Sequence, residues 1–258
     1  MDPDGRRLIF GSERFTSALN LSMQAADGTG SPIRLTGSLS AQSPTSVSRD
    51  GQQIVFNQNT PNRQQRDLRL FTFAPAATAS GAQRPSASRG GGAPSEQVFG
   101  GTLRPLLETR FEERGGVLSP DDRWLAYESN SSGTFEVYVR PFPNVGDGQW
   151  QVSTGGGVQA LWSHDGRELF YIAPDGALMV VAVSPAGNAW RAGAPATLSE
   201  RPYYTGGDNF VSRHYDITAD GKRFIMVKEA FGDQAGNTQN LVVVQNWTEE
   251  LKRLVPNK

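Results

Sequence analysis

The sequence contains no cysteine and only two histidines among its 258 residues. The absence of cysteine excludes disulfide bonds and thiolate metal sites. Lys and Arg together number 25 and Asp and Glu 26, which gives a net charge of −1 and no basic field of the kind that binds nucleic acid. No apolar run approaches the length of a membrane span, and residues 1–14 lack the pattern of a signal peptide. We therefore expect no nucleic-acid partner and no membrane insertion by this chain itself.

Glycine and proline, by contrast, are plentiful, with 29 and 16 residues. No long stretch has the periodicity of an amphipathic helix. Many short strands separated by frequent turns are typical of such a composition. Because all-β domains of this length are common, we expect a single all-β domain over residues 1–258.

One short motif occurs five times along the chain. It consists of Ser or Thr, any residue, Asp, Gly, a long polar residue, one free position and three apolar residues. Asp-Gly favours a tight hairpin turn because Gly adopts positive φ without strain, and the Asp carboxylate can accept N–H groups of the turn. The three apolar residues indicate a strand buried on both faces. The predicted structural turn residues are Asp4, Asp50, Asp121, Asp165 and Asp220.

The third copy departs from the motif, since Asp122 stands where the other copies have Gly. Asp tolerates the left-handed backbone conformation better than most residues, so the departure is mild. The surrounding stretch, residues 118–142, contains two strand-like runs joined by a loop with a glycine, which predicts a hairpin. We expect this hairpin to be the central strand pair of one repeat.

The spacing of the motif predicts the architecture. The five Asp residues are 46, 71, 44 and 55 positions apart, and two of these intervals match the period of roughly 40–45 residues in propeller blades. The longest interval contains residues 74–95, a segment rich in Ala, Ser, Gly and Pro that we expect to be a flexible loop. Each interval offers four strands, and four-stranded sheets arranged radially form a β-propeller. The expected blade repeats are 1–36, 40–107, 113–153, 157–198 and 210–256, with approximate bounds.

The motif resembles the repeat of TolB-type propellers. Residues 118–258, which include LSPDDRWLAYESNSSGTFEVYVRPFP and RHYDITADGKRFIMVK, also resemble the C-terminal propeller region of bacterial serine/threonine protein kinases. The first resemblance implies six blades, so five repeats predict an incomplete six-bladed propeller. The second implies a parent protein with a kinase domain and a membrane anchor, and therefore a periplasmic or extracytoplasmic location.

These resemblances lead to an expected function. The glycine-rich loop, the H-R-D motif and the D-F-G motif of kinases are all missing, so we expect this chain not to be an enzyme. The favoured hypothesis is a non-catalytic binding or sensing module that recognises a protein or a small ligand at the loop face or in the central channel. One alternative is a TolB-like periplasmic translocation or scaffold protein. Another is a propeller hydrolase or lyase with its site in the channel.

One predicted loop region gathers aromatic and cationic side chains, a mixture that is enriched in interface hot spots. The same mixture also suits a long connection that folds over its own sheet. No G-x-S-x-G elbow and no phosphate-binding loop occurs. We therefore assign no catalytic residue, cofactor or metal site. The candidate partner or ligand surface consists of Arg201, Tyr203, Tyr204, Phe210, Arg213 and His214.

An incomplete propeller would leave one sheet face without its neighbour, and exposed sheet faces promote association. We expect the purified chain to be only marginally soluble. A monodisperse monomer with one sharp cooperative thermal transition would contradict this expectation.

Overall fold

The computed structural model describes residues 2–61, 65–74, 97–184, 190–200 and 213–227, all within one compact unit, Met1–Lys228. This part of the chain is all β and contains no helix, and therefore no helix that could cross a membrane. The predicted flexible loop, apart from Ala74, lies outside the described residues, as do Arg201, Tyr203, Tyr204 and Phe210.

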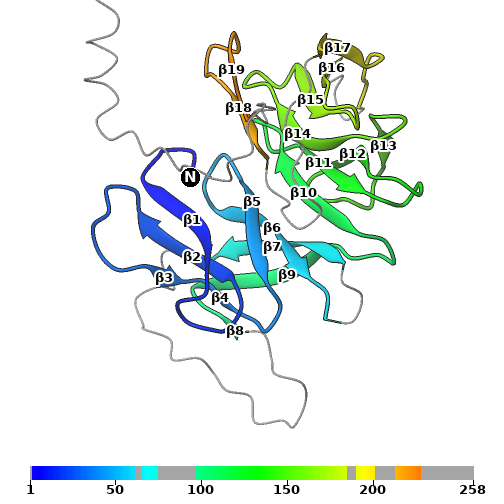
Figure 1. Cartoon of the computed structure of the whole chain (residues 1–258). Helices are drawn as coiled ribbons and strands as arrows, with labels where there is room; N and C mark the ends of the chain where they lie inside the picture. Colours follow the sequence, from blue (N-terminus) through cyan, green and yellow to red (C-terminus); the bar gives the residue numbers. More distant parts are fainter. Residues whose placement is uncertain (1, 62–64, 75–96, 185–189, 201–212, 228–258) are drawn as a thin grey trace, which may run out of the picture. The chain divides into compact units, whose positions relative to one another are not determined.

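The strands form antiparallel sheets that follow one another in chain order (Figure 1). The first sheet has the order β1 (Arg7–Ser12), β2 (Asn20–Ala25), β3 (Ile33–Arg34). The second is β5 (Gln42–Val47), β6 (Gln53–Asn59), β7 (Arg66–Phe73), β9 (Gly101–Leu107). The third is β10 (Glu113–Leu118), β11 (Trp124–Ser129), β12 (Glu136–Pro141), β13 (Trp150–Gln151). The fourth is β14 (Val158–Trp162), β15 (Glu168–Ile172), β16 (Leu178–Ala182), β17 (Ala196–Ser199).

Two shorter pairs complete the described part: β18 (Tyr215–Ile217) with β19 (Phe224–Met226), and β4 (Thr36–Gly37) with β8 (Gln97–Val98). The predicted all-β fold with four-stranded antiparallel sheets is confirmed. The predicted hairpin also forms, as β11 paired with β12. The predicted bounds of the five blade repeats stay a prediction.

The second strand of each four-stranded sheet is buried on both faces, as its apolar triplet predicts. In β11 every residue is buried. Successive side chains point to opposite faces, so Trp124 and Ala126 contribute to one apolar core and Leu125 and Tyr127 to another. The strand therefore belongs to two cores at once, which ties the third sheet to both of its neighbours.

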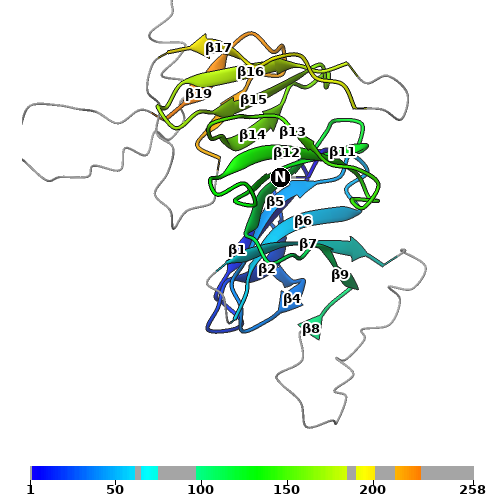
Figure 2. The same cartoon turned by 90° about the vertical axis from the view of Figure 1, so that its right-hand side faces the viewer.

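An apolar core lies between each pair of successive sheets. The largest joins the third and fourth sheets, where Trp124 packs against Trp150 and Trp190, and Trp190 packs against Trp162, with ring centroids 5.5–5.6 Å apart. Figure 2 shows these sheets lying face to face. Aromatic edge-to-face packing at such distances adds to the free energy gained by burial.

The repeated motif forms the same hydrogen-bonded turn in each sheet. Ser119 Oγ donates to Asp121 Oδ1 at 2.6 Å and accepts the N–H of Trp124 at 3.0 Å. The serine hydroxyl thus joins the turn to the first residue of the outgoing strand. Hydrogen bonds of this kind hold the pKa of the turn carboxyls below the ordinary value at Asp50, Asp165 and Asp220.

The first copy of the motif makes the turn with a carboxylate in place of the hydroxyl. Asp2 stands at the serine position and accepts the N–H of Arg7 at 2.9 Å, and its other oxygen accepts from Arg7 Nε at 2.5 Å. Asp2 is buried. The sequence reading missed this residue because the motif there begins with Asp rather than Ser or Thr.

The turn is longer than the two-residue Asp-Gly turn that the sequence suggested. A backbone hydrogen bond joins Gly51 N to Ser48 O, and only the glycine of each motif has positive φ, as at Gly51 (67°) and Gly166 (69°). A glycine in the left-handed conformation at the last loop position is typical of hairpin loops of three or more residues. The glycine is therefore required, but the Asp before it has ordinary φ.

Asp122 adopts this left-handed conformation without being glycine, with φ of 56°. Its Oδ2 accepts the N–H of Arg49, in the turn of the second sheet, at 2.8 Å. The substitution therefore creates a hydrogen bond between two neighbouring sheets that glycine could not make. Burial, with the nearby carboxylates of Asp50 and Asp121, raises the pKa of Asp122, although the Arg49 N–H and guanidinium act in the opposite direction.

This pKa predicts how stability depends on pH. When the folded-state pKa of a carboxyl lies above its unfolded value, its stabilising contribution is complete below the unfolded value and is lost as pH rises through the folded pKa. Asp122→Asn keeps an acceptor oxygen for Arg49 and cannot ionise. We expect the free energy of unfolding of Asp122→Asn, relative to the wild type, to rise as pH increases from about 3 to about 7, measured by urea denaturation.

The matched control is Asp122→Gly, which restores the residue of the other motifs. It should share the pH profile of Asp122→Asn but lack the hydrogen bond to Arg49. Parallel profiles for the wild type and Asp122→Asn would show that the carboxyl does not titrate in this way.

Candidate functional site

The first strand of each of the three four-stranded sheets contains an irregularity in its pairing. The pairing of β5, β10 and β14 with the following strand shifts register between Pro44 and Ser46, between Arg114 and Val117, and between Val158 and Leu161. Such bulges re-aim side chains and occur next to functional sites. The polar residues around these bulges form the candidate site, which we call the polar network; it consists of Arg66, Glu112, Arg114, Glu128 and Gln159.

Glu128, on β11, lies at the centre of the polar network and is buried. One carboxylate oxygen accepts from Arg114 Nε at 2.8 Å, and the other accepts the N–H of Gln159 at 2.6 Å. Burial raises the pKa of Glu128, while Arg114 and the N–H of Gln159 favour the charged form. The carboxylate therefore joins the third sheet to the first strand of the fourth.

Glycine is required beside this carboxylate. Gly115 has φ of 63°, and a Cβ there would lie 2.9 Å from Glu128 Oε1. Its N–H donates to Asn57 Oδ1 on β6 at 3.0 Å. The close approach that glycine permits lets the second and third sheets meet at the buried carboxylate.

A second carboxylate extends the polar network toward the second sheet. Glu112 Oε1 lies 2.6 Å from Arg66 Nη1, on β7, and 3.8 Å from Arg114 Nη1. The three side chains are between 11% and 19% exposed. Arg114 therefore lies between two carboxylates, one at 2.8 Å and one at 3.8 Å.

Gln159 extends the polar network toward β18. It is buried and has φ of 59°, a strained conformation for a residue with a side chain. Its Oε1 accepts the N–H of His214 at 2.8 Å, and its carbonyl accepts from the Tyr215 hydroxyl at 2.7 Å. Strain of this kind persists where surrounding contacts fix it, often at functional positions.

Two arginine–phenylalanine stacks lie at the outer side of the polar network. The Arg110 guanidinium lies 4.7 Å from the Phe111 ring centroid, and the Arg114 guanidinium lies 3.6 Å from that of Phe135. Phe111 and Phe135 are partly exposed, and Arg110 is exposed. We call Arg110, Phe111 and Phe135 the rim patch.

Of the six residues predicted as a partner or ligand surface, the structure describes Arg213 and His214. His214 is bonded through its N–H to Gln159, and Arg213 Nε donates to the carbonyl of Tyr215 at 3.0 Å. Both therefore lie at the polar network, although the sequence reading placed them in a loop with aromatics. Sequence reasoning missed Glu128, whose available signal is an acid that directly follows four apolar residues of one strand.

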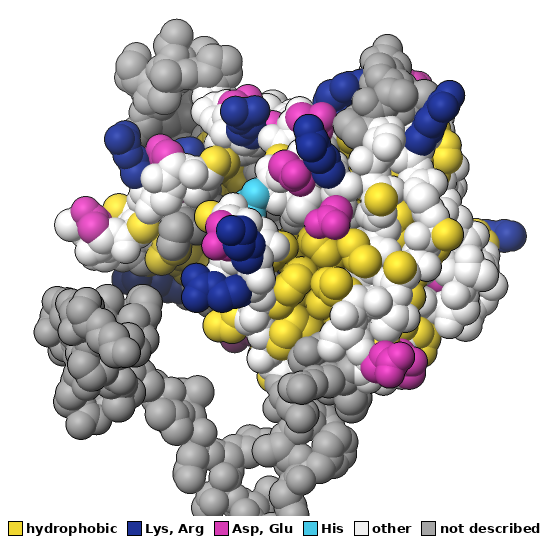
Figure 3. All heavy atoms as spheres, turned by 90° about the horizontal axis from the view of Figure 1, so that it is seen from above, with side chains coloured by type: hydrophobic (Ala, Val, Ile, Leu, Met, Phe, Trp, Pro, Cys, Tyr) yellow, Lys and Arg dark blue, Asp and Glu magenta, His cyan; other side chains and the backbone are white. Residues whose placement is uncertain are grey.

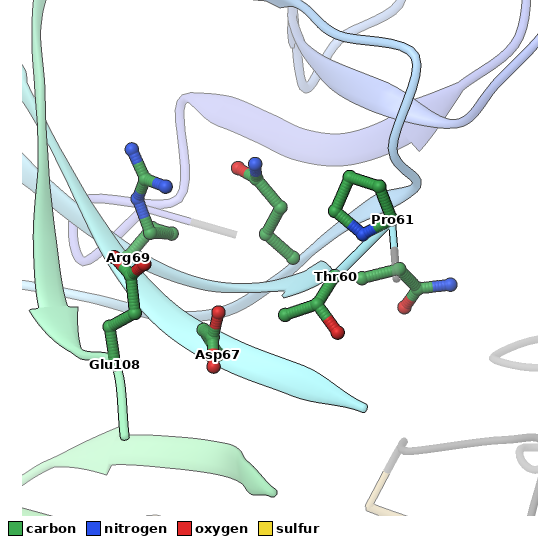
Figure 4. Close-up of a pocket in the computed structure, with 7 residues that line it drawn as sticks. Thr60, Pro61, Asp67, Arg69 and Glu108 are labelled. Carbon is green, nitrogen blue, oxygen red and sulfur yellow. The ribbon is translucent and has the colours of Figure 1, made fainter. Parts of the chain in front are cut away.

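A cavity of about 180 Å³ opens at the matching end of the second sheet (Figure 4). Its lining is Gln58, Asn59, Thr60, Pro61, Asp67, Arg69 and Glu108. In Figure 4, Arg69 and Glu108 lie on one side of Asp67, and Thr60 and Pro61 on the other. The lining is therefore polar and carries both signs of charge.

Acidic and basic side chains are interspersed on the face that Figure 3 shows, around an apolar area. No group of three or more metal-ligating side chains occurs among the residues that the structure describes. The candidate site is therefore a set of paired charges and hydrogen bonds, and it offers carboxylates, guanidinium groups and aromatic rings to a binding partner.

Comparison with known proteins identifies the fold. No protein-family model matches the sequence, and a search of curated proteins finds no match. Among solved structures, a TolB-type protein from Agrobacterium tumefaciens matches with a TM-score of 0.56 and 14% identity, over 88% of this chain and 71% of that one. The periplasmic gluconolactonase PpgL from Pseudomonas aeruginosa matches with a TM-score of 0.52 and 17% identity, over 86% of this chain and 61% of that one. The fold is a β-propeller of the TolB-like kind.

These matches correct one prediction. The sequence reading concluded from missing kinase motifs that the chain is not an enzyme. That conclusion is wrong as it stands, because a gluconolactonase has the same fold, so a propeller without kinase motifs can still be an enzyme. The TolB-type resemblance is confirmed at the level of fold, whereas the resemblance to a kinase C-terminal region stays a prediction.

The polar network predicts a large stability effect. Glu128→Gln removes the charge that faces Arg114 in a buried site, and breaking a buried ion pair on one side costs about 3–5 kcal/mol. Because Glu112 still lies near Arg114, we expect a loss of about 3 kcal/mol in the free energy of unfolding, measured by chemical denaturation.

The control is the double variant Arg114→Met with Glu128→Gln, which removes both charges. It should recover a large part of the loss, since replacing both members of a buried pair is often nearly neutral. A double variant as unstable as the sum of its two single variants would mean that the two side chains do not interact.

Proposed function

We propose that this chain is a protein-binding propeller that recognises its partner through the rim patch. The observation that carries the proposal is the pair of arginine–phenylalanine stacks around β10, of which the Arg114–Phe135 stack is held in position by the carboxylates of Glu128 and Glu112. Arginine and aromatic residues are the side chains most enriched in interface hot spots.

The ion pairs of Arg114 fix one side chain of the rim patch in position before a partner binds. Phe135 is stacked by Arg114, which Glu128 and Glu112 hold in position. A side chain that is already fixed loses less conformational entropy on binding. The positive charge of the exposed Arg110 favours a partner segment that carries carboxylates.

The fold likeness to a TolB-type protein supports this function, and the likeness to a periplasmic gluconolactonase supports a periplasmic location. A TolB-like translocation or scaffold role fits this evidence better than a sensor attached to a kinase. The kinase-linked role is supported by the sequence resemblance alone.

A second candidate function is lactone hydrolysis. The chain shares its fold with a gluconolactonase, and Glu113, at the start of β10, has a carboxyl pKa raised by burial while Thr109 Oγ1 donates to it at 2.6 Å. A carboxyl with a raised pKa suits general acid–base catalysis.

The test of partner binding uses a photo-crosslinking amino acid at position 110 and the cell fractions of the bacterium that makes the protein. We expect a specific crosslinked protein that is lost in Phe111→Ala. Loss of one hot-spot aromatic should weaken binding at least about 30-fold. Binding of the identified partner is then measured by calorimetry.

The matched control is Phe15→Ala, which removes an exposed phenylalanine (41% exposed) from the first sheet's loop. It should bind as the wild type does. Equal loss in both variants, or no specific crosslink, would refute the rim patch as the binding surface. Turnover of glucono-lactone by the wild type, without partner capture, would favour the second candidate.

A further inference from the structure

The dipeptide Asp-Gly occurs seven times in the sequence, four times within the repeated motif and three times outside it. In a flexible chain this dipeptide is chemically labile, because the backbone nitrogen of the glycine can attack the carboxyl carbon of the aspartate side chain. The small glycine leaves that approach open. The seven aspartates are Asp4, Asp27, Asp50, Asp147, Asp165, Asp175 and Asp220.

Six of the seven dipeptides form the same hydrogen-bonded turn. In each of them the glycine N–H donates to the carbonyl three residues earlier, at 2.8–3.1 Å. The aspartate carboxylate accepts the N–H of the residue after the glycine, at 2.9–3.2 Å. All six glycines have positive φ, between 67° and 82°. The carboxylate is thus used as a turn acceptor, the role in which Asp commonly stabilises turns.

This turn protects the dipeptide from attack of the glycine nitrogen on the side chain. The nitrogen must lose its proton and reach the carboxyl carbon, but its N–H is bonded to a carbonyl and the carboxylate is bonded to another N–H. An ionised carboxylate is also a poor electrophile. Hydroxyl and N–H donors hold the carboxyl pKa below its ordinary value at Asp27, Asp50, Asp165 and Asp220.

Asp147 is the exception. It is exposed and lies in the loop between β12 and β13, two strands labelled in Figure 1. Within the part of the chain that the structure describes, its carboxylate accepts no hydrogen bond, and the N–H groups of Gly148 and Gln149 donate none. Gly148 also lacks the positive φ of the other six glycines. Neither the nucleophile nor the electrophile is therefore restrained here.

We propose that Asp147 is the site at which this chain converts aspartate to isoaspartate. The backbone nitrogen of Gly148 forms a bond to Cγ of Asp147, and the N–H proton leaves with a carboxyl oxygen as water. Water then adds to the main-chain carbonyl of the resulting succinimide ring, and the original peptide bond breaks. The main chain now runs through the side-chain carboxyl, and the mass of the protein is unchanged.

The product alters the loop that leads into β13. Arg140 fixes this loop on both sides of the site, since its Nη1 donates to the carbonyl of Val145 and its Nη2 to Gln149 Oε1, each at 2.7 Å. Isoaspartate adds one carbon to the main chain between these two anchors. Gly148 has little room to move, because a Cβ there would lie 2.7 Å from the Trp150 ring. The inserted carbon therefore acts directly on the start of the outer strand of the third sheet.

The inference does not depend on the proposed function, because Asp147 shares no contact or residue with the rim patch. Its test is peptide mapping of the folded full chain after several weeks near neutral pH at physiological temperature. Electron-transfer fragmentation distinguishes isoaspartate from aspartate of the same mass. We expect at least about tenfold more isoaspartate at position 147 than at any other Asp-Gly pair, because the other turns must first break two hydrogen bonds.

Two comparisons separate the effect of the fold from that of the local sequence. In concentrated urea, where the turns are lost, the excess at position 147 should disappear. Asp147→Glu should remove the product at this position, because the longer side chain would have to close a six-membered ring, which forms far more slowly. The matched control is Asp175→Glu, at another exposed Asp-Gly pair, which should leave the reaction at Asp147 unchanged.

Two outcomes would overturn the proposal. One is a folded chain in which position 147 contains no more isoaspartate than position 175. The other is an equally large excess at position 147 in urea, because the neighbouring residues in the sequence, rather than the missing turn, would then be its cause.

Discussion

The structure depends on the face-to-face packing of successive sheets. The second strand of each four-stranded sheet has apolar residues on both faces, so it cannot be buried by one neighbour alone. β11 shows the consequence, since Trp124 packs toward the fourth sheet and Leu125 toward the second. The second, third and fourth sheets are therefore each packed between two neighbours.

The two ends of the strands serve different purposes. At one end, the Asp-containing turns repeat, with Asp2 in place of the hydroxyl residue in the first copy and Asp122 in place of glycine in the third. This repetition is explained by the need of every sheet to form the same turn between its strands. At the other end, residues differ from sheet to sheet, and Glu128, Gln159 and Asp67 each have a distinct environment. The candidate site lies at this end, where the side chains are not repeated from sheet to sheet.

Much of the fold could be predicted from the sequence. The motif Asp positions and the apolar triplets predicted the turns and the doubly buried strands, because both depend on residues close together in the chain. The turn geometry was predicted less well: the reading assumed positive φ at both Asp and Gly, whereas only the glycine position, including Asp122, needs it. Asp2 was missed because a carboxylate replaces the serine hydroxyl.

The candidate site could be predicted only in fragments. His214 and Arg213 were noted for their composition, but nothing in their spacing linked them to Gln159, 55 residues earlier. The sequence by itself determined which residues turn and which strands are buried on both faces, because these follow from local sterics and periodicity. Only the tertiary structure decided that Arg66, Glu128 and Gln159 belong to one network. Their contacts form between different sheets. The spacing of residues in the sequence does not indicate which side chains come into contact when the sheets pack.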